Sequence, residues 1–238
     1  MKKILVTFIL MIAITQFGIS QVTSKGFYAD GGIAFPLKDL GKGVVSENNS
    51  GMASTGFHIE VGYSHLFTEL FGVKLATYYY GSRYSRHKFD NFYRGRLDDA
   101  THSVESTQGW SMTGLLLKPF IFLPVGDKFH LEINGTAGFL AFYTPKYQLI
   151  TQSFIPNGNS TPSNYYRNQG KGNSFAYGAG SRMVFSFKKM DWFVSADLFY
   201  SNIKYTASGI NESNTSYSFI NKMNIGYFSI NIGYIVYL

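Results

Sequence analysis

Two His–Glu pairs have the residue types and the spacing that site chemistry requires. His58 precedes Glu60 by two positions, and His130 precedes Glu132 in the same way. Residues two apart in a strand share one face, and imidazole with carboxylate can ligate zinc or exchange protons. A zinc site would need both histidines to converge from different strands, and nothing in the spacing requires that. We therefore expect neither a metal nor a cofactor, and expect both pairs to belong to a larger set of charges.

That larger set lies on the polar side of the strands proposed below. Its acidic and basic members are about balanced, and a buried charge without a partner costs on the order of several kcal/mol. A paired network that fills an interior is therefore favoured over a narrow proton or ion path. The predicted interior network consists of Asp30, His58, Glu60, Lys74, Lys118, His130, Glu132, Arg182 and Asp197.

A second set of candidates lies in a charged segment between residues 83 and 105. Its basic members are Arg83, Arg86, His87, Lys88, Arg94 and Arg96. Such side chains could form charge-assisted hydrogen bonds with the phosphates of lipopolysaccharide or with an acidic partner. The acidic residues that offset them are Asp90, Asp98, Asp99 and Glu105. An ordinary solvated loop is therefore the favoured interpretation.

The same charged segment gives little reason to expect a catalytic site. His87, Asp90 and His102 are near one another in sequence, as at the rim of small barrel enzymes that act on lipids. No spacing motif identifies a nucleophile beside them. We predict a protein that is not an enzyme, with a rim-site lipid-modifying enzyme as the alternative.

The elements that must position these residues are β-strands, and the clearest is Phe228–Leu238, which reads FSINIGYIVYL. Apolar residues occupy one parity of this stretch, while the other parity is mostly small or polar. Alternate residues of a strand point to opposite faces, so one face is apolar throughout. A membrane barrel would place that face against lipid.

Seven further stretches alternate in a similar way before this closing strand. They cover about 27–35, 54–66, 70–84, 109–122, 129–143, 174–187 and 192–205. In the fourth stretch, three successive leucines interrupt the alternation, and an inward Lys118 directs Leu115 and Leu117 outward. Short connections near residues 68, 126 and 190 alternate with long polar loops at 38–53, 85–108, 145–173 and 206–218. The third of these loops holds Tyr147, Tyr165 and Tyr166, which could present an adhesive surface to a protein partner.

An even number of strands joined by alternately short and long connections predicts an all-β fold, an eight-stranded antiparallel up-and-down transmembrane β-barrel. The alternative is a soluble exported β-barrel binding protein, whose outward face should carry charges. Only 15% of the residues are charged and 18% are aromatic. Several aromatic residues lie near strand ends, as in the girdles at lipid interfaces. Eight strands leave an interior that side chains fill, so we expect no wide pore.

The first 20 residues have the organisation of a secretory signal peptide. Two lysines precede an apolar run that ends near Ile14, and small residues precede Gln21. We predict cleavage after Ser20, with 21–238 as a single barrel domain. Loss of both lysines leaves 19 basic and 14 acidic residues, a charge of +5. Export argues against nucleic acid as the partner of this charge and favours anionic lipids.

Together these features resemble the outer-membrane β-barrel proteins of Gram-negative bacteria, in the size class of OmpA/OmpX-type barrels. In that family the last strand carries a signal for the barrel-insertion machinery, with apolar residues at alternate positions before a terminal aromatic residue. The matching positions are Ile230, Ile232, Tyr234, Val236 and Leu238, with leucine where the family usually has phenylalanine. The composition rich in Tyr and Asn, and Gln21 after the cleavage point, resemble the PorT-like porin-family barrels of Bacteroidetes.

The resemblance implies a location in the cell outer membrane and a structural, adhesive or secretion-accessory role. It also implies outer-membrane lipids, lipopolysaccharide and the insertion machinery as partners.

Overall fold

The computed structural model describes residues 24–42, 51–85, 87–88, 100–106, 108–126, 128–153, 163–187, 190–210 and 215–238. Eight long strands are β1 (Lys25–Leu37), β2 (Ala53–Leu66), β3 (Phe71–Tyr84), β5 (Trp110–Gly126), β6 (Phe129–Tyr143), β9 (Lys171–Phe187), β10 (Met190–Ile210) and β11 (Ser216–Tyr237). Three shorter strands are β4 (Ala100–Ser106), β7 (Tyr147–Ser153) and β8 (Ser163–Arg167), and one helical turn, α2 (Lys38–Gly41), follows β1. The predicted signal peptide lies outside the described residues.

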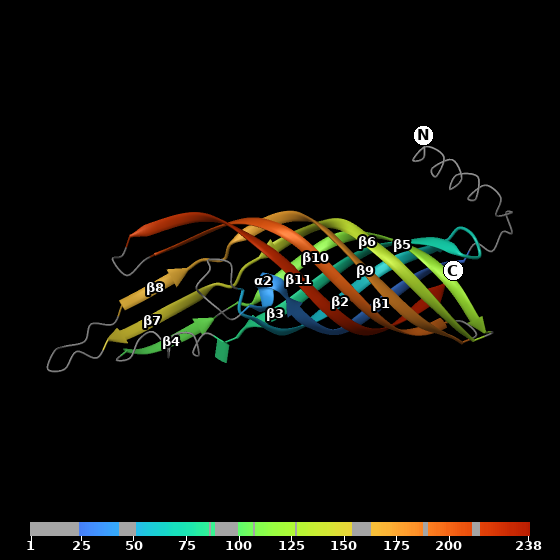
Figure 1. Ribbon diagram of the computed structural model, residues 1–238, viewed down its shortest axis with the longest axis horizontal. Helices are drawn as coiled ribbons and strands as arrows, with labels where there is room; N and C mark the ends of the chain where they lie inside the picture. The colour runs from blue at the N-terminus through green and yellow to red at the C-terminus, as the bar shows by residue number, and fades with distance from the viewer. Residues whose placement is uncertain are drawn as a thin grey trace, which may run out of the picture.

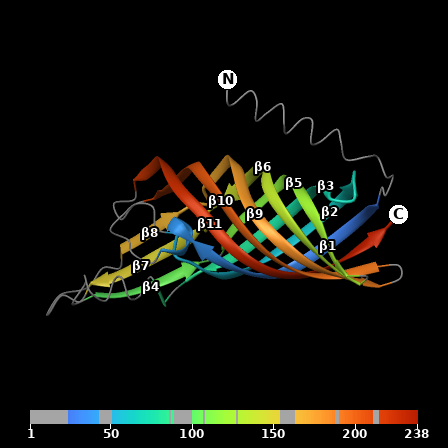
Figure 2. The same cartoon turned by 45° about the vertical axis from the view of Figure 1, so that its right-hand side comes forward.

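The eight long strands form a closed ring. Each pairs antiparallel with the next long strand along the chain, and β11 pairs back onto β1, from Gly26 with Tyr237 to Leu37 with Gly226. The result is an up-and-down barrel whose strands tilt across its long axis (Figure 1; Figure 2). The predicted fold class is confirmed. Among the described residues, no helix has the length and apolar character needed to cross a membrane.

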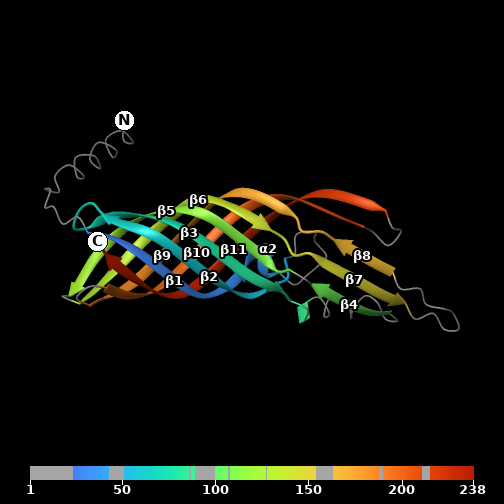
Figure 3. The same cartoon turned by 180° about the vertical axis from the view of Figure 1, so that it is seen from behind.

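The two ends of the barrel differ. The short connections after β2, β5 and β9 lie at the same end as the C-terminus, and we call this the turn end (Figure 1). The opposite end, called the loop end here, carries α2 and the short strands β4, β7 and β8 (Figure 3).

The barrel wall has its apolar residues outside, as the segment 115–118 shows. Leu115 and Leu117 are 57% and 51% exposed, whereas Leu116 and Lys118 are 1% and 4% exposed. The predicted facing of this strand is therefore confirmed. A barrel that dissolves in water buries its apolar face, so this distribution is the reverse of a soluble barrel and suits a wall surrounded by lipid.

Three of the predicted loops, 85–108, 145–173 and 206–218, contain β-structure. β10 continues to Ile210 and β11 begins at Ser216, so most of the predicted loop 206–218 is a hairpin that projects beyond the ring. At the loop end, β4 pairs with β7, β7 with β8, and β8 with the tip of β10. This three-stranded ribbon extends past the barrel (Figure 1). These strands lack one uniformly apolar face, so the alternation that revealed the others is weak in them.

Candidate functional site

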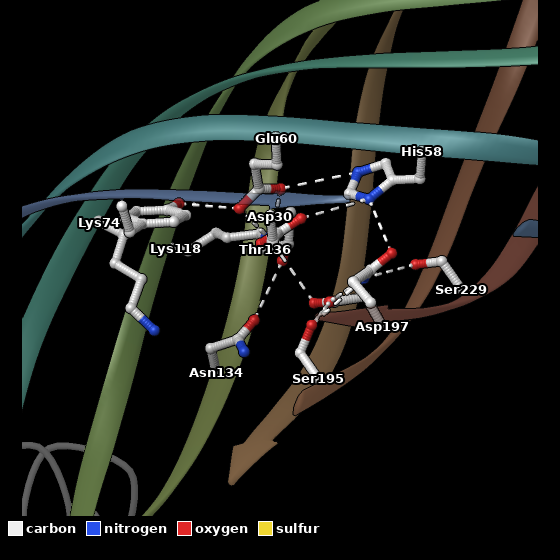
Figure 4. Close-up of polar contacts among 12 residues, drawn as sticks. Asp30, His58, Glu60, Lys74, Lys118, Asn134, Thr136, Ser195, Asp197 and Ser229 are labelled. Atoms are coloured by element: carbon white, nitrogen blue, oxygen red, sulfur yellow. Dashed lines mark hydrogen bonds and ion pairs between the residues drawn. The ribbon is translucent and has the colours of Figure 1, made fainter. Parts of the chain in front are cut away.

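The interior of the barrel is the candidate site, because it gathers the nine residues of the interior network. β1, β2, β3, β5, β6, β9 and β10 each contribute at least one of them. The side chain of Asp197 is 13% exposed, and the other eight residues are buried. Figure 4 shows several of them converging from strands on different sides of the lumen.

One half of the network centres on Lys118. Its ammonium group donates to Glu60 Oε1 and Oε2 at 2.8 and 2.7 Å, and it lies 3.5 Å from Asp197 Oδ1. Tyr28 donates its hydroxyl to the same Glu60 carboxylate at 2.8 Å. The Glu60 carboxylate is thus paired and hydrogen-bonded, as a buried charge requires.

The other half centres on Glu132. Lys74 donates to Glu132 Oε2, and Arg182 Nη1 lies 3.8 Å from the same oxygen. Arg182 Nη2 reaches Asp30 Oδ2 at 3.4 Å. Arg182 therefore joins the Glu132 carboxylate to that of Asp30, across the width of the lumen.

Arg182 also packs between two aromatic rings. Its guanidinium carbon lies 3.7 Å from the ring centroid of Phe193 and 4.6 Å from that of Tyr28. Its Nε and Nη1 atoms have no hydrogen-bond partner among the described residues. Cation–π contact with both rings compensates part of the cost of burying this charge.

His58 links the two halves of the network. Its Nδ1 lies 3.7 Å from Asp30 Oδ1, and its Nε2 lies 3.9 Å from Glu60 Oε2. Nδ1 also lies 3.1 Å from Asn231 Oδ1, while the Asn231 amide nitrogen donates to Asp197 Oδ2 at 3.3 Å. Because the amide oxygen is an acceptor, His58 donates through Nδ1.

The two His–Glu pairs do not meet as a metal site. His130 Nε2 lies 3.9 Å from Glu132 Oε1, and the His130 ring packs against Phe122 with centroids 4.2 Å apart. Within the described ranges, no three or more His, Cys, Asp or Glu side chains are arranged to hold a metal ion. Both glutamates instead carry ion pairs with lysine.

Several neutral residues of the network were not among the predicted ones. Asn231 also donates to the hydroxyl groups of Ser195 and Ser229, each at 3.2 Å. Thr136 donates to Asn134 Oδ1 at 3.4 Å (Figure 4). All of them share the inward parity of their strands, so the same alternation that selected the charged residues would have found them.

An aromatic layer fills the lumen between the network and the loop end. Tyr227 stacks on Tyr80 and Phe199, with centroids 4.9 Å apart in both pairs, and Phe199 lies 5.3 Å from Tyr78. α2 adds the fully buried Leu40 beyond them. The expectation of a side chain-filled interior holds, but the filling in this half is aromatic rather than small and polar.

At the turn end the lumen is more open. A cavity of about 710 Å³ is lined by His130, Glu132, Lys128 and Tyr237, among others. Tyr237 donates its hydroxyl to Asp191 at this mouth, at 2.5 Å.

The predicted basic loop is only partly described. Arg83 and His87 are exposed. Lys88 donates its ammonium group to the carbonyl oxygens of Gly41 and Ala53, at 2.8 and 3.0 Å, and thereby holds α2 to β2. Its partial burial lowers its pKa below the ordinary value for lysine. Arg86, Arg94 and Arg96 lie outside the described residues.

The outer wall carries the apolar side of the closing strand. Ile230, Ile232, Tyr234 and Val236 are 49%, 61%, 43% and 42% exposed, and Leu238 is 78% exposed. Aromatic side chains pair on this wall near both ends of the barrel. Near the turn end the pairs are Phe27 with Tyr63 and Trp192 with Tyr234, and nearer the loop end they are Phe57 with Tyr79 and Tyr177 with Tyr200.

The ring is closed, its apolar side chains face outward, and its lumen is filled by side chains. These three features define the class of small eight-stranded β-barrels with an outward apolar wall. A major outer membrane protein from Thermus thermophilus has this fold, at 10% identity and a TM-score of 0.50, over 92% of this chain and 100% of that chain. At 10% sequence identity, this similarity shows a shared fold and does not show a shared function. Two weaker matches are Neisserial surface protein A (10% identity, TM-score 0.48, 92% and 100% covered) and the attachment invasion locus protein Ail of Yersinia pestis (13%, 0.41, 90% and 98%). No family model and no curated protein matches the chain.

Proposed function

We propose that this chain is an integral outer-membrane protein that is not an enzyme, and that its barrel anchors β-structure outside the cell. The observation that carries the proposal is the inverted wall, which presents Leu, Ile and Phe outward and encloses paired charges. A membrane supplies the apolar surroundings that such a wall requires. Unpaired charges would make the same interior costly.

The filled lumen supports an anchoring role rather than transport by diffusion. Solutes that enter the cavity at the turn end meet the interior network and then the stacked rings of Tyr80, Tyr227 and Phe199. An eight-stranded ring has room inside for little more than its own side chains.

The structure at the loop end supports a role in contacts outside the cell. The β10–β11 hairpin and the ribbon of β4, β7 and β8 extend past the ring (Figure 1). Tyr166, on β8, is 40% exposed, and exposed tyrosine suits protein contacts at low entropic cost. This arrangement supports a structural or adhesive role.

The location is tested by fractionating the cells that make the protein. We expect the protein in the detergent-extracted outer-membrane fraction, with a band in SDS gels that shifts on heating. Recovery in a carbonate-washed periplasmic extract would overturn the proposal. N-terminal sequencing of the recovered protein should begin at Gln21 if the signal peptide is removed as predicted.

A secretion-accessory role in the manner of the PorT-like barrels is the finer form of the proposal. Its support is the composition rich in Tyr and Asn. Deletion of the gene separates the roles: loss of secreted proteins from the medium supports the accessory role. Unchanged secretion with weaker surface attachment supports the adhesive one.

For the absence of enzymatic activity, the expected result is an unchanged lipid A mass spectrum in an overexpressing strain.

A further inference from the structure

The outward side chains of β9, β10 and β11 change in steps from mid-wall to the loop end. In order, the cross-strand neighbours are Leu198 with Phe228, Tyr200 with Tyr177 and Gly226, Asn202 with Asn224, and Lys204 with Lys222. The series therefore runs from apolar through aromatic and amide side chains to lysine. Aromatic rings of a membrane barrel mark the level where hydrocarbon gives way to headgroups. The lysines lie beyond that level and on the same lipid-facing side of the wall.

Three lysines form this outer cluster, which we call the lysine patch: Lys171, Lys204 and Lys222. Lys204 and Lys222 stand directly opposite each other in the β10–β11 ladder, so their Cβ atoms are about 5 Å apart. Lys171 pairs with Thr206, one outward step farther along β10. All three are exposed. Like charges directly opposite in a sheet destabilise it, so the patch opposes folding unless an anion accompanies it.

The protein itself supplies no such anion among the residues described. No hydrogen bond or ion pair engages the three ammonium groups there. The acidic residue of α2, Asp39, pairs with Lys42 at 2.8 Å and accepts the Asn224 backbone amide at 2.8 Å. Its carboxylate is therefore already occupied by partners other than the patch.

We propose that the lysine patch binds the phosphate groups of lipid A, the membrane anchor of lipopolysaccharide, in the leaflet that surrounds the loop end. This inference rests on the proposed outer-membrane function and names a partner for one face of the barrel. Phosphate oxygens accept charge-assisted hydrogen bonds from lysine. The acyl chains of the same molecule would lie against the apolar wall below, near Leu198 and Phe228.

Continuity with the apolar wall favours a lipid over a soluble polyanion. A soluble anion would gain nothing from Tyr177, Tyr200 and the apolar rows beneath them, whereas a phosphorylated lipid contacts the whole graded face. The patch also differs from the basic loop predicted from sequence. There, Lys88 is occupied by the carbonyl oxygens of Gly41 and Ala53.

The test titrates the full chain, folded in detergent micelles, with bisphosphorylated lipid A and with dephosphorylated lipid A. The variant is K204Q/K222Q, and the matched control is K25Q/K128Q, which removes two exposed lysines at the turn end. We expect K204Q/K222Q to weaken binding of bisphosphorylated lipid A about tenfold, since each lysine contributes to attraction by an anionic membrane surface. The control should bind as the wild type does, and dephosphorylated lipid A should not distinguish the three proteins.

A second measurement guards against a folding defect. Without lipid A, K204Q/K222Q should unfold at the same or a higher denaturant concentration than the wild type, because a like-charge pair has been removed. Unchanged affinity for lipid A in K204Q/K222Q would overturn the inference. So would an equal loss in the control, or displacement of lipid A by pyrophosphate at equal concentration. Binding in micelles does not depend on cellular location, so failed fractionation overturns the proposed function separately.

Discussion

Lys118 donates to both carboxylate oxygens of Glu60, at 2.8 and 2.7 Å, although its strand β5 and the Glu60 strand β2 are not neighbours in the sheet. The pair therefore reaches past the intervening strand β3, on the inner side of the wall, instead of joining neighbours in the ladder. Both side chains are buried. Because water is excluded there, the Glu60 carboxylate and the Lys118 ammonium group stabilise each other's charge.

Replacement of Lys118 by methionine should lower the free energy of unfolding by about 3–5 kcal/mol, because it leaves Glu60 charged and buried without its cation. The measurement is denaturant unfolding in micelles, followed by tryptophan fluorescence. K118M/E60Q should recover part of the loss, because a neutral amide needs no counter-charge. The exposed K128Q control should stay within about 0.5 kcal/mol of the wild type. Simple additivity in the double variant would contradict the ion pair.

Two buried tyrosines provide a matched pair for the hydrogen bonds of the interior. Tyr28 donates to Glu60 Oε1 at 2.8 Å, whereas the Tyr78 hydroxyl has no partner among the described residues. Y28F should cost about 1.5–3 kcal/mol, because it removes a hydrogen bond to a charged group. Y78F should be neutral or slightly stabilising in the same unfolding assay. Equal effects of the two substitutions would show that the Tyr28 contact contributes nothing.

Tyr234 tests the closing strand. It faces outward, 43% exposed, with Trp192 beside it at a centroid distance of 6.1 Å. Y234D places a charge on the apolar side of the wall and should block assembly, seen as loss of the heat-shifted band. Y234F keeps the ring and should assemble normally. Normal assembly of Y234D, and of a chain lacking Tyr237 and Leu238, would show that this strand is not the insertion signal.

The aromatic layer predicts that the barrel does not conduct ions. Purified protein in planar bilayers should give no stable conductance above that of protein-free membranes. The physical reason is that the rings of Tyr80, Tyr227 and Phe199 stack inside the lumen, with centroids 4.9 Å apart in each pair with Tyr227. A reproducible ohmic channel in the wild type would contradict the closed lumen.

The barrel itself could be predicted because lipid on one side and a filled lumen on the other impose a period of two. In the irregular segment 115–117, the charge of Lys118 alone indicates the facing, because a lysine at this depth must point inward. β4, β7 and β8 could not be found in this way. Beyond the ring, neither face of a strand meets hydrocarbon, and the apolar parity disappears at residues such as Thr206 and Ser218.

The interior was predictable in membership but not in pairing. Parity alone placed Asp30, Arg182 and Glu132 on one face. Which carboxylate meets which cation depends on the stagger between strands, and alternation carries no information about it. The link from His58 to Asn231 joins β2 to β11 across β1, and only the closed ring brings those strands near each other.

That closure has a consequence for biogenesis. The seam from Gly26 with Tyr237 to Leu37 with Gly226 joins strands at opposite ends of the described chain. Until it forms, two strand edges expose unpaired amide and carbonyl groups, which hydrocarbon tolerates poorly. A chain that lacks β1 or β11 therefore cannot form the seam. Those two open edges distinguish an unfinished barrel from a finished one.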